Sequence, residues 1–244
     1  MKNEYVTLQG NNISTSQRYN GINYFGAHKS AFSNDQRIIE PVILTKHYLP
    51  SVISAFNDKL RLYNGKKRLP RKDVDELHHT LIFDGWVYLN QGYIGGNGFR
   101  ELSIERMVDY KDDEFVKETE PLKECLWEND VLIDLDPENF NHQGLPKPKA
   151  KSKVQEFKKG ENVYFFHPVD GAVARFGAIS GGAYLYCYRD PRSSNVALGV
   201  FVCSEGTQKN LEQLLSIIKK AKLSPDGLRE AIQLRDAVNL ICKK

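Results

Sequence analysis

The sequence has no long hydrophobic run, no secretory leader and no paired cysteine motif. Its apolar stretches fall well short of the ~20 residues that a membrane-spanning helix needs. The N-terminal MKNEYVTLQG lacks the apolar segment of a secretory signal. These absences predict a cytoplasmic protein with no membrane partner. The four cysteines form no C-x-x-C pair, which argues against a zinc ribbon or a thioredoxin-type site.

The chain also lacks a strong overall charge, because 34 Lys and Arg residues nearly balance 31 Asp and Glu residues. This balance argues against a histone-like polycation, and a hydrophobic content of 41% argues against a disordered chain. The charge is nevertheless uneven. Residues 1–145 hold 17 basic and 22 acidic residues, whereas residues 146–244 hold 17 basic and 9 acidic residues. The difference predicts a basic interaction surface in the C-terminal part.

Residues 142–160 have the composition of a linker between two domains. Their sequence, HQGLPKPKAKSKVQEFKKG, alternates proline and lysine over much of its length and contains few large apolar residues. Such a composition favours an extended, solvated backbone. We therefore predict a mixed α+β domain over residues 1–141 and a second domain over residues 161–244. In the first domain, the spacing of apolar residues after Pro50 predicts a helix over about 50–63.

The second domain is predicted to combine a small β-barrel with a helical hairpin. Strand-like runs at 163–167, 170–178, 182–188 and 195–203 are separated by turn residues, which indicates a small antiparallel, SH3-like barrel. Thr207 and Ser224 are suitable caps for two following helices, which predicts a C-terminal helical hairpin. The expected fold class is therefore α+β: a mixed N-terminal domain, a barrel-like sheet and a helical hairpin.

Basic residues interleaved with aromatic residues are the strongest functional signal. Lysine and arginine neutralise phosphates, and exposed rings such as those of Tyr164, Tyr184 and Tyr186 can stack on bases. A solvated linker followed by ordinary core aromatics is the alternative. We predict non-catalytic binding of nucleic acid, or of another polyanionic partner, through the linker and the C-terminal unit. The residues expected to bind it are Lys147, Lys149, Lys151, Lys153, Lys158, Lys159, Arg175, Arg189 and Arg192.

Two other functions stay open at this point. Asp134 and Asp136 follow the apolar run VLI at alternate positions, so one strand could direct both carboxylates to a Mg²⁺ ion. A Mg²⁺-dependent phosphoryl-transfer or nuclease-type enzyme is one alternative, in which Glu156 and Lys158 resemble an E-x-K element. Otherwise no cofactor is expected. The second alternative is a protein-interaction or assembly subunit, which should expose a large apolar patch to a protein partner.

Overall fold

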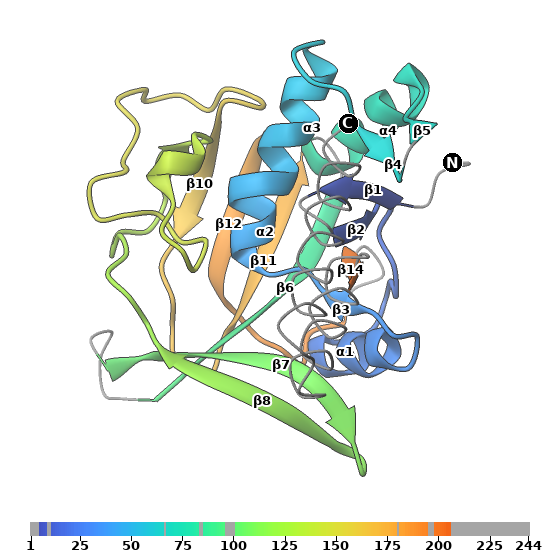
Figure 1. Cartoon of the computed structure of the whole chain (residues 1–244). Helices are drawn as coiled ribbons and strands as arrows, with labels where there is room; N and C mark the ends of the chain where they lie inside the picture. The colour runs from blue at the N-terminus through green and yellow to red at the C-terminus, as the bar shows by residue number, and fades with distance from the viewer. Residues whose placement is uncertain are drawn as a thin grey trace, which may run out of the picture. The chain divides into compact units, whose positions relative to one another are not determined.

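The structure is a computed structural model that describes residues 5–8, 11–65, 67–82, 85–95, 101–179, 181–194 and 198–205. The described part of residues 12–204 belongs to one compact unit. Three sheets and a small number of helices make up this unit (Figure 1).

The α-helices of the described residues lie between residues 24 and 82. Helix α1 (Tyr24–Phe32) is capped by Asn23, whose side chain accepts a hydrogen bond from the Gly26 amide at 2.9 Å. The elements α2 (Pro41–Ile43), η1 (Leu44–Tyr48, a π-helical turn) and α3 (Leu49–Phe56) follow one another directly, and α4 (Arg71–Ile82) comes next. The helix expected over 50–63 therefore starts earlier and ends at Phe56, shortly before Asp58 adopts a positive φ of 58°.

The largest sheet has eight strands in the order β8-β7-β6-β11-β12-β10-β9, with β13 also paired to β6. Most pairs are antiparallel, but β10 is parallel to β12 and β13 is parallel to β6. The strands are β6 (Gly85–Ile94), β7 (Ser103–Lys111), β8 (Glu114–Pro121), β9 (Val131–Asp134), β10 (Asn162–Phe166), β11 (Val173–Ile179), β12 (Gly182–Arg189) and β13 (Leu198–Val200). A short 3₁₀ helix, η3 (Pro137–Asn139), follows β9.

Two smaller sheets complete the unit. One has the order β1-β2-β14-β3, and the other pairs β4 with β5. Their strands are β1 (Tyr5–Leu8), β2 (Asn11–Ser14), β3 (Arg37–Ile38), β4 (Tyr63–Asn64), β5 (Lys67–Arg68) and β14 (Val202–Glu205).

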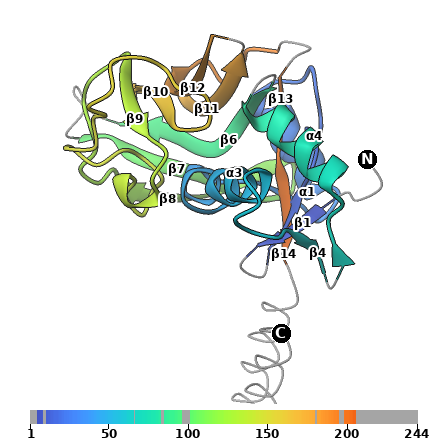
Figure 2. The same cartoon turned by 90° about the horizontal axis from the view of Figure 1, so that it is seen from above.

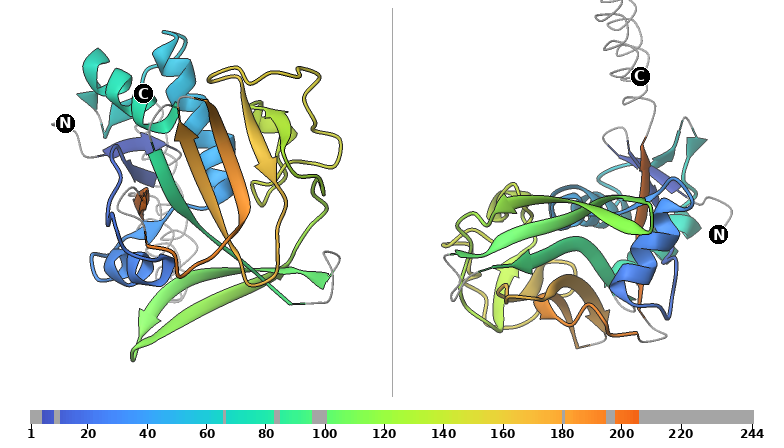
Figure 3. Two further views of the ribbon diagram at one scale, coloured as in Figure 1. Left: turned by 180° about the vertical axis from the view of Figure 1, so that it is seen from behind. Right: turned by 90° about the horizontal axis from the view of Figure 1, so that it is seen from below.

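The main hydrophobic core lies between the large sheet and the helices of segment 41–82. Val87, Phe176, Leu185 and Phe165 come from four neighbouring strands and pack in one cluster with side chains of η1, α3 and α4. Because side chains alternate across a strand, their neighbours in sequence point to the opposite face. Figure 2 shows α3 on one side of these strands, and Figure 3 shows the other side of β11, β12 and β10 with no described helix over it.

The predicted fold class is wrong in its C-terminal part. The four expected strand regions do contain β10, β11, β12 and the β13–β14 pair, but these form no closed barrel within the described residues. They extend a sheet that includes β6 and β9 from the predicted first domain, and the described residues are mostly β-sheet with short helices. A barrel of about forty residues would have to enclose its own core, whereas these strands bury one face on helices contributed by residues 41–82.

The stretch 142–160 follows the edge of the same sheet. Strands β9 and β10 lie on either side of it in the chain and pair with each other, and Lys151 forms a β-bridge with Ile133. Leu145 is fully buried, so the stretch is anchored to the core at its start. Independent folding of 1–141 and 161–244 stays a prediction. The helical hairpin expected after Thr207 lies outside the described residues.

Candidate nucleic-acid interface

The face of the large sheet that is turned away from helices α3 and α4 carries an array of aromatic rings. Trp86 comes from β6, Tyr184 and Tyr186 come from β12, and Tyr164 and Phe166 come from β10. The register places Tyr164 beside Tyr184 and Phe166 beside Tyr186, with Gly177 between Trp86 and Tyr184. We call this array the aromatic platform; it consists of Trp86, Phe157, Tyr164, Phe166, Tyr184, Tyr186 and Tyr188.

The rings of the platform are close together, and several are nearly parallel. The centroids of Tyr184 and Tyr186 are 5.3 Å apart with an interplanar angle of 1°. Trp86 lies 6.3 Å from Tyr184 and 5.7 Å from Tyr186, at angles of 8° and 7°. These separations are longer than a full face-to-face stack of ~3.5 Å, so the rings are offset and do not cover one another completely. All but Tyr186 are half-buried.

Two glycines explain why rings of the platform lie flat. A Cβ atom at Gly177 would be 2.2, 2.4 and 2.6 Å from Cε3, Cζ3 and Cδ2 of Trp86, which are consecutive ring atoms. Nearly equal distances to consecutive atoms place that position over the face of the indole and not at its edge. The indole therefore lies against the backbone of β11. Gly182 has the same relation to Tyr184, because its Cβ would be 2.5 Å from the hydroxyl oxygen and 2.7 Å from Cζ.

A β-bulge at the end of β12 brings an arginine onto the same face. Val173 pairs with Arg189 and Arg175 pairs with Tyr186, so two residues of β12 lie opposite the single residue Ala174. The extra residue changes which side of the strand the following side chain takes. Arg189 consequently lies over the rings of Tyr186 and Tyr188, with its Cζ atom 4.0 and 4.8 Å from their centroids. Such stacking holds the guanidinium in place and leaves its charge intact.

Arg175 is the second arginine of this region, and it is only 7% exposed. Its guanidinium lies 4.3 Å from the centroid of Tyr88, and its Nη2 donates a hydrogen bond of 2.5 Å to the Tyr88 hydroxyl. Tyr88 in turn donates to the Ser193 carbonyl. Burial lowers the pKa of Arg175 from its usual value, although an arginine remains protonated at neutral pH. Among the described residues, no carboxylate forms an ion pair with Arg175 or Arg189.

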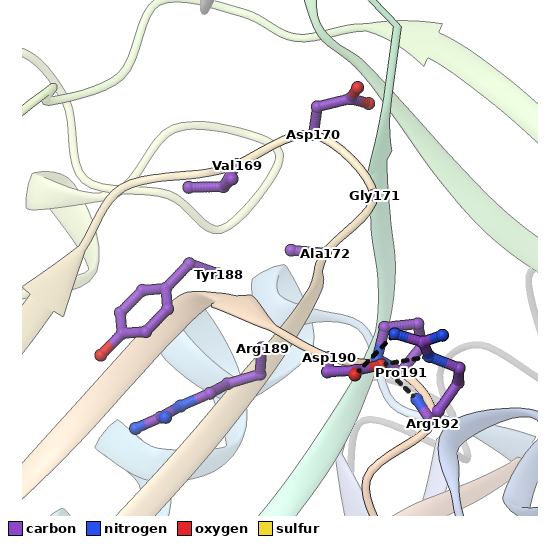
Figure 4. Close-up of a pocket in the computed structure, with 9 residues that line it drawn as sticks. All are labelled: Val169, Asp170, Gly171, Ala172, Tyr188, Arg189, Asp190, Pro191 and Arg192. Atoms are coloured by element: carbon purple, nitrogen blue, oxygen red, sulfur yellow. Dashed lines mark hydrogen bonds and ion pairs between the residues drawn. The ribbon is translucent and has the colours of Figure 1, made fainter.

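The acid nearest to these arginines in the chain is already occupied. Asp190 accepts hydrogen bonds from the backbone amide, Nε and Nη2 of Arg192, at 2.8, 3.1 and 3.1 Å. Figure 4 shows the Arg192 side chain turned back onto Asp190, whereas Tyr188 and Arg189 extend away from it in a common direction. All four residues line a pocket of about 280 Å³. Asp170, on the other side of this pocket, accepts a hydrogen bond from the Gly95 amide at 3.0 Å.

The predicted lysines are all exposed, and several have acidic partners at the sheet edge. Lys151 forms an ion pair with Glu128 at 2.8 Å, and Lys147 lies 3.9 Å from Glu138. Lys158 lies 3.8 Å from Glu161 and directly follows Phe157, which stacks on Tyr164. The nine predicted binding residues are thus divided. Arg175 and Arg189 lie at the platform, Lys158 lies at its border, and Arg192 is bound to Asp190. Lys151 lies beside β9 and Lys147 beside η3, and the remaining three, Lys149, Lys153 and Lys159, are exposed.

The two carboxylates of the metal hypothesis have separate structural partners. Asp134 accepts a hydrogen bond of 2.6 Å from the Ser152 hydroxyl, and Asp136 accepts one of 2.9 Å from the Glu138 amide at the start of η3. Among the described residues, no group of three His, Cys, Asp or Glu side chains is arranged to hold a metal ion. The magnesium alternative stays a prediction without support from this geometry.

Three features of the platform escape prediction from the sequence. Trp86 belongs to the first half of the chain, and the flat positions of Trp86 and Tyr184 depend on Gly177 and Gly182. The only signal in the sequence is that glycines and alanines stand next to aromatic residues in RFGAISGGAYLYCYR. The position of Arg189 depends on the bulge, which no sequence signal indicates.

No helix within the described part of the chain is both long enough and apolar enough to cross a membrane. Comparisons with protein-family models, curated proteins and solved structures find no significant match for this chain.

Proposed function

We propose that this protein binds nucleic acid without catalysing a reaction, and that the aromatic platform is its binding surface. The observation that carries the proposal is that Trp86 and Tyr184 lie flat on glycines, on the face of β11, β12 and β10 that no described helix covers. A cytoplasmic location belongs to the same proposal. Cys125 and Cys187, which are buried and form no disulfide, support it, because reducing compartments keep cysteines in this state.

The platform rings can stack on the bases of a nucleic acid. Every base has an apolar π-face, and each stacked base contributes about 1–3 kcal/mol when it is measured by alanine substitution of the ring beneath it. Rings that stand on edge would offer little area to a base. The platform rings lie flat or offset and keep part of their outer faces accessible, so they match this ligand.

Positive charges around the platform can bind the phosphates of a nucleic acid. Arg175 and Arg189 add two positive charges at one end of the platform, and exposed lysines of the stretch 147–159 add more along its border. The ion pairs of Lys147, Lys151 and Lys158 are solvent-exposed and therefore weak, so a phosphate can replace their carboxylate partners at a small cost. Affinity for nucleic acid should consequently fall as salt rises.

The experiment measures both the affinity for nucleic acid and the contact of the ligand with Trp86. The chain has two tryptophans, so a Trp127→Phe variant leaves Trp86 as the only indole reporter. We expect added oligonucleotides, single-stranded or duplex, to quench its fluorescence at low salt. We expect Trp86→Ala to lower the affinity about tenfold in fluorescence anisotropy, because it removes one stacking surface.

The matched control is Tyr63→Ala, which removes an exposed ring on β4, away from the platform. It should leave the affinity unchanged. The proposal is wrong if no nucleic acid binds at low salt. It is also wrong if binding occurs without quenching of Trp86 and with equal affinity for the Trp86→Ala variant.

A further inference from the structure

We infer that the ligand of the platform is a single strand, and that Arg175 and Arg189 together hold one of its backbone phosphates. This inference rests on the proposed function and adds to it the strandedness of the ligand and the place of its phosphate. It depends on the width of the platform, on two arginines that form no ion pair with a carboxylate among the described residues, and on the hydrogen bonds that Arg192 donates to Asp190.

The width of the platform argues against a duplex. Its rings come from β6, β12 and β10, with β11 between the first two, so it extends over four adjacent strands. Strands lie ~4.8 Å apart, which makes this face about 14 Å wide. The major groove of B-DNA is ~12 Å wide and admits a helix or a two-stranded ribbon. A four-stranded face therefore cannot reach paired bases, whereas the bases of a single strand can be placed flat on it.

The two guanidinium groups lie over rings on either side of β11, and within the described residues neither forms an ion pair with a carboxylate. Arg175 is the register partner of both Tyr88 and Tyr186; its guanidinium lies over Tyr88, and that of Arg189 lies 4.0 Å from the centroid of Tyr186. The Nε atoms of both arginines are buried and have no hydrogen-bond partner within the described residues. Neighbouring like charges without an ion-pair partner are costly. A phosphate that accepts hydrogen bonds from the two guanidinium groups would neutralise the pair, and the planar guanidinium is well suited to this contact.

Asp190 could fill the same role, but Arg192 prevents it. Both carboxylate oxygens of Asp190 are bound by Arg192, through Oδ1 and Oδ2. Within the described residues, Asp190 consequently forms its ion pair with Arg192 and none with Arg175 or Arg189. Arg192, predicted as a direct ligand of the nucleic acid, acts in this arrangement by holding Asp190 and not by contacting phosphate.

The experiment compares three probes by fluorescence anisotropy over a range of salt concentrations. The probes are a labelled twelve-nucleotide oligothymidine, a twelve-base-pair duplex, and a strand of the same bases with an uncharged backbone. We expect oligothymidine to bind at least tenfold more tightly than the duplex. Arg189→Gln should weaken oligothymidine about tenfold at low salt, and should lower its salt slope by about 0.7, the value for one phosphate contact on a single strand.

The uncharged strand isolates the phosphate contact. Arg189→Gln should leave its affinity unchanged, because the stacking surface of Trp86 and Tyr184 is not altered. The matched control is Arg71→Gln, the same change at an arginine of α4 that is paired with Asp58 and Asp75. It should change neither affinity nor slope.

Each result separates this inference from the proposed function. Absence of binding to every nucleic acid overturns the proposed function, and the inference with it. Binding with quenched Trp86 but with equal or tighter affinity for the duplex overturns only the single-strand assignment. Oligothymidine binding whose salt slope is the same for wild type and Arg189→Gln overturns only the phosphate assignment.

A second variant, Arg175→Lys, tests whether Arg175 takes part in the phosphate contact. It keeps the charge but loses the planar pair of donors, so we expect weaker oligothymidine binding with an unchanged salt slope. Far-ultraviolet circular dichroism establishes that the variant is folded before its affinity is compared. Wild-type affinity in a folded Arg175→Lys protein would exclude Arg175 from the phosphate contact and would overturn the paired-arginine assignment.

Discussion

The two faces of the central sheet both contain aromatic residues, but they use them differently. On β10, Phe165 is fully buried and packs in the main core, whereas its neighbour Tyr164 is half-buried and stacks on Tyr184 and Phe157. The core face gains its stability from the helices that cover it. On the other face, rings cover one another only in part. Aromatic content alone therefore does not tell a packed core from an open face of the sheet; the covering layer does.

Substituting the two neighbours on β10 is the strongest test of this difference. Phe165→Ala should lower the free energy of unfolding by about 3–5 kcal/mol, because it leaves a cavity in a packed core. Tyr164→Ala should lower it by about 1 kcal/mol, because a half-buried ring loses fewer contacts. Urea denaturation measures both values. Equal losses for the two variants would show that the platform is as well packed as the core, and the distinction between the faces would be lost.

The sequence predicted single elements better than their assembly. The strand regions around β10, β11 and β12 were recognised because aromatic and β-branched residues alternate between turn residues. The barrel was wrong because the partners of these strands are distant in the chain. β11 pairs with β6, which lies more than 70 residues earlier, and β10 is parallel to β12. Local patterns contain no information about which remote strand will be the neighbour.

For the candidate site, the sequence identified the region but not its geometry. The basic C-terminal charge and the tyrosines of β10 and β12 indicated where to look. Alternation explains why Tyr184 and Tyr186 share one face. The contribution of Trp86 requires the β6–β11 register, and that of Arg189 requires a bulge. The lysines looked like the principal ligands because they are regularly spaced, yet the structure pairs some of them with glutamates.

Substitution of Gly177 tests whether the platform depends on flat rings. Its Cβ would be 2.2 Å from the Trp86 ring, so Gly177→Ala must displace the indole and should cost about 1–3 kcal/mol of stability. Gly181→Ala is the control, because nothing lies within 4 Å of its Cβ position. Combining Gly177→Ala with Trp86→Ala should cost less than the sum of the single changes, since the clash is then absent. Additive losses in urea denaturation would show that the Trp86 ring does not lie against Gly177.

We expect the stability of the covered end of the platform face to depend on pH. Tyr88 follows Trp86 on that face, and Tyr24 of α1 packs over it with centroids 5.6 Å apart. Beside Tyr24 lies His28, whose pKa burial lowers from 6.5 to about 3. Between these two values the unfolded chain binds a proton that the folded chain does not. Stability should therefore fall as pH decreases below 6.5, by up to about 1.4 kcal/mol per pH unit.

His28→Leu should abolish this contribution and flatten the dependence of unfolding free energy on pH between 6.5 and 4. The substitution keeps an apolar side chain against Tyr24, Phe32 and Phe115. His79→Leu, also on a helix but exposed, is the control and should leave the dependence as in the wild type. Identical pH profiles for wild type and His28→Leu would show that His28 is protonated in the folded protein.

The smallest effect is expected at the sheet edge, where the sequence placed the main binding charges. Lys151 is exposed and its pair with Glu128 is solvated, so Lys151→Gln should change the free energy of unfolding by less than ~0.5 kcal/mol. Its effect on oligonucleotide binding should be smaller than that of Arg189→Gln and should disappear at high salt, because distant exposed charges are screened. If the order of the two variants were reversed in the anisotropy measurement, the edge beside β9 would be the principal phosphate-binding surface, and the aromatic platform would play only a secondary part in affinity.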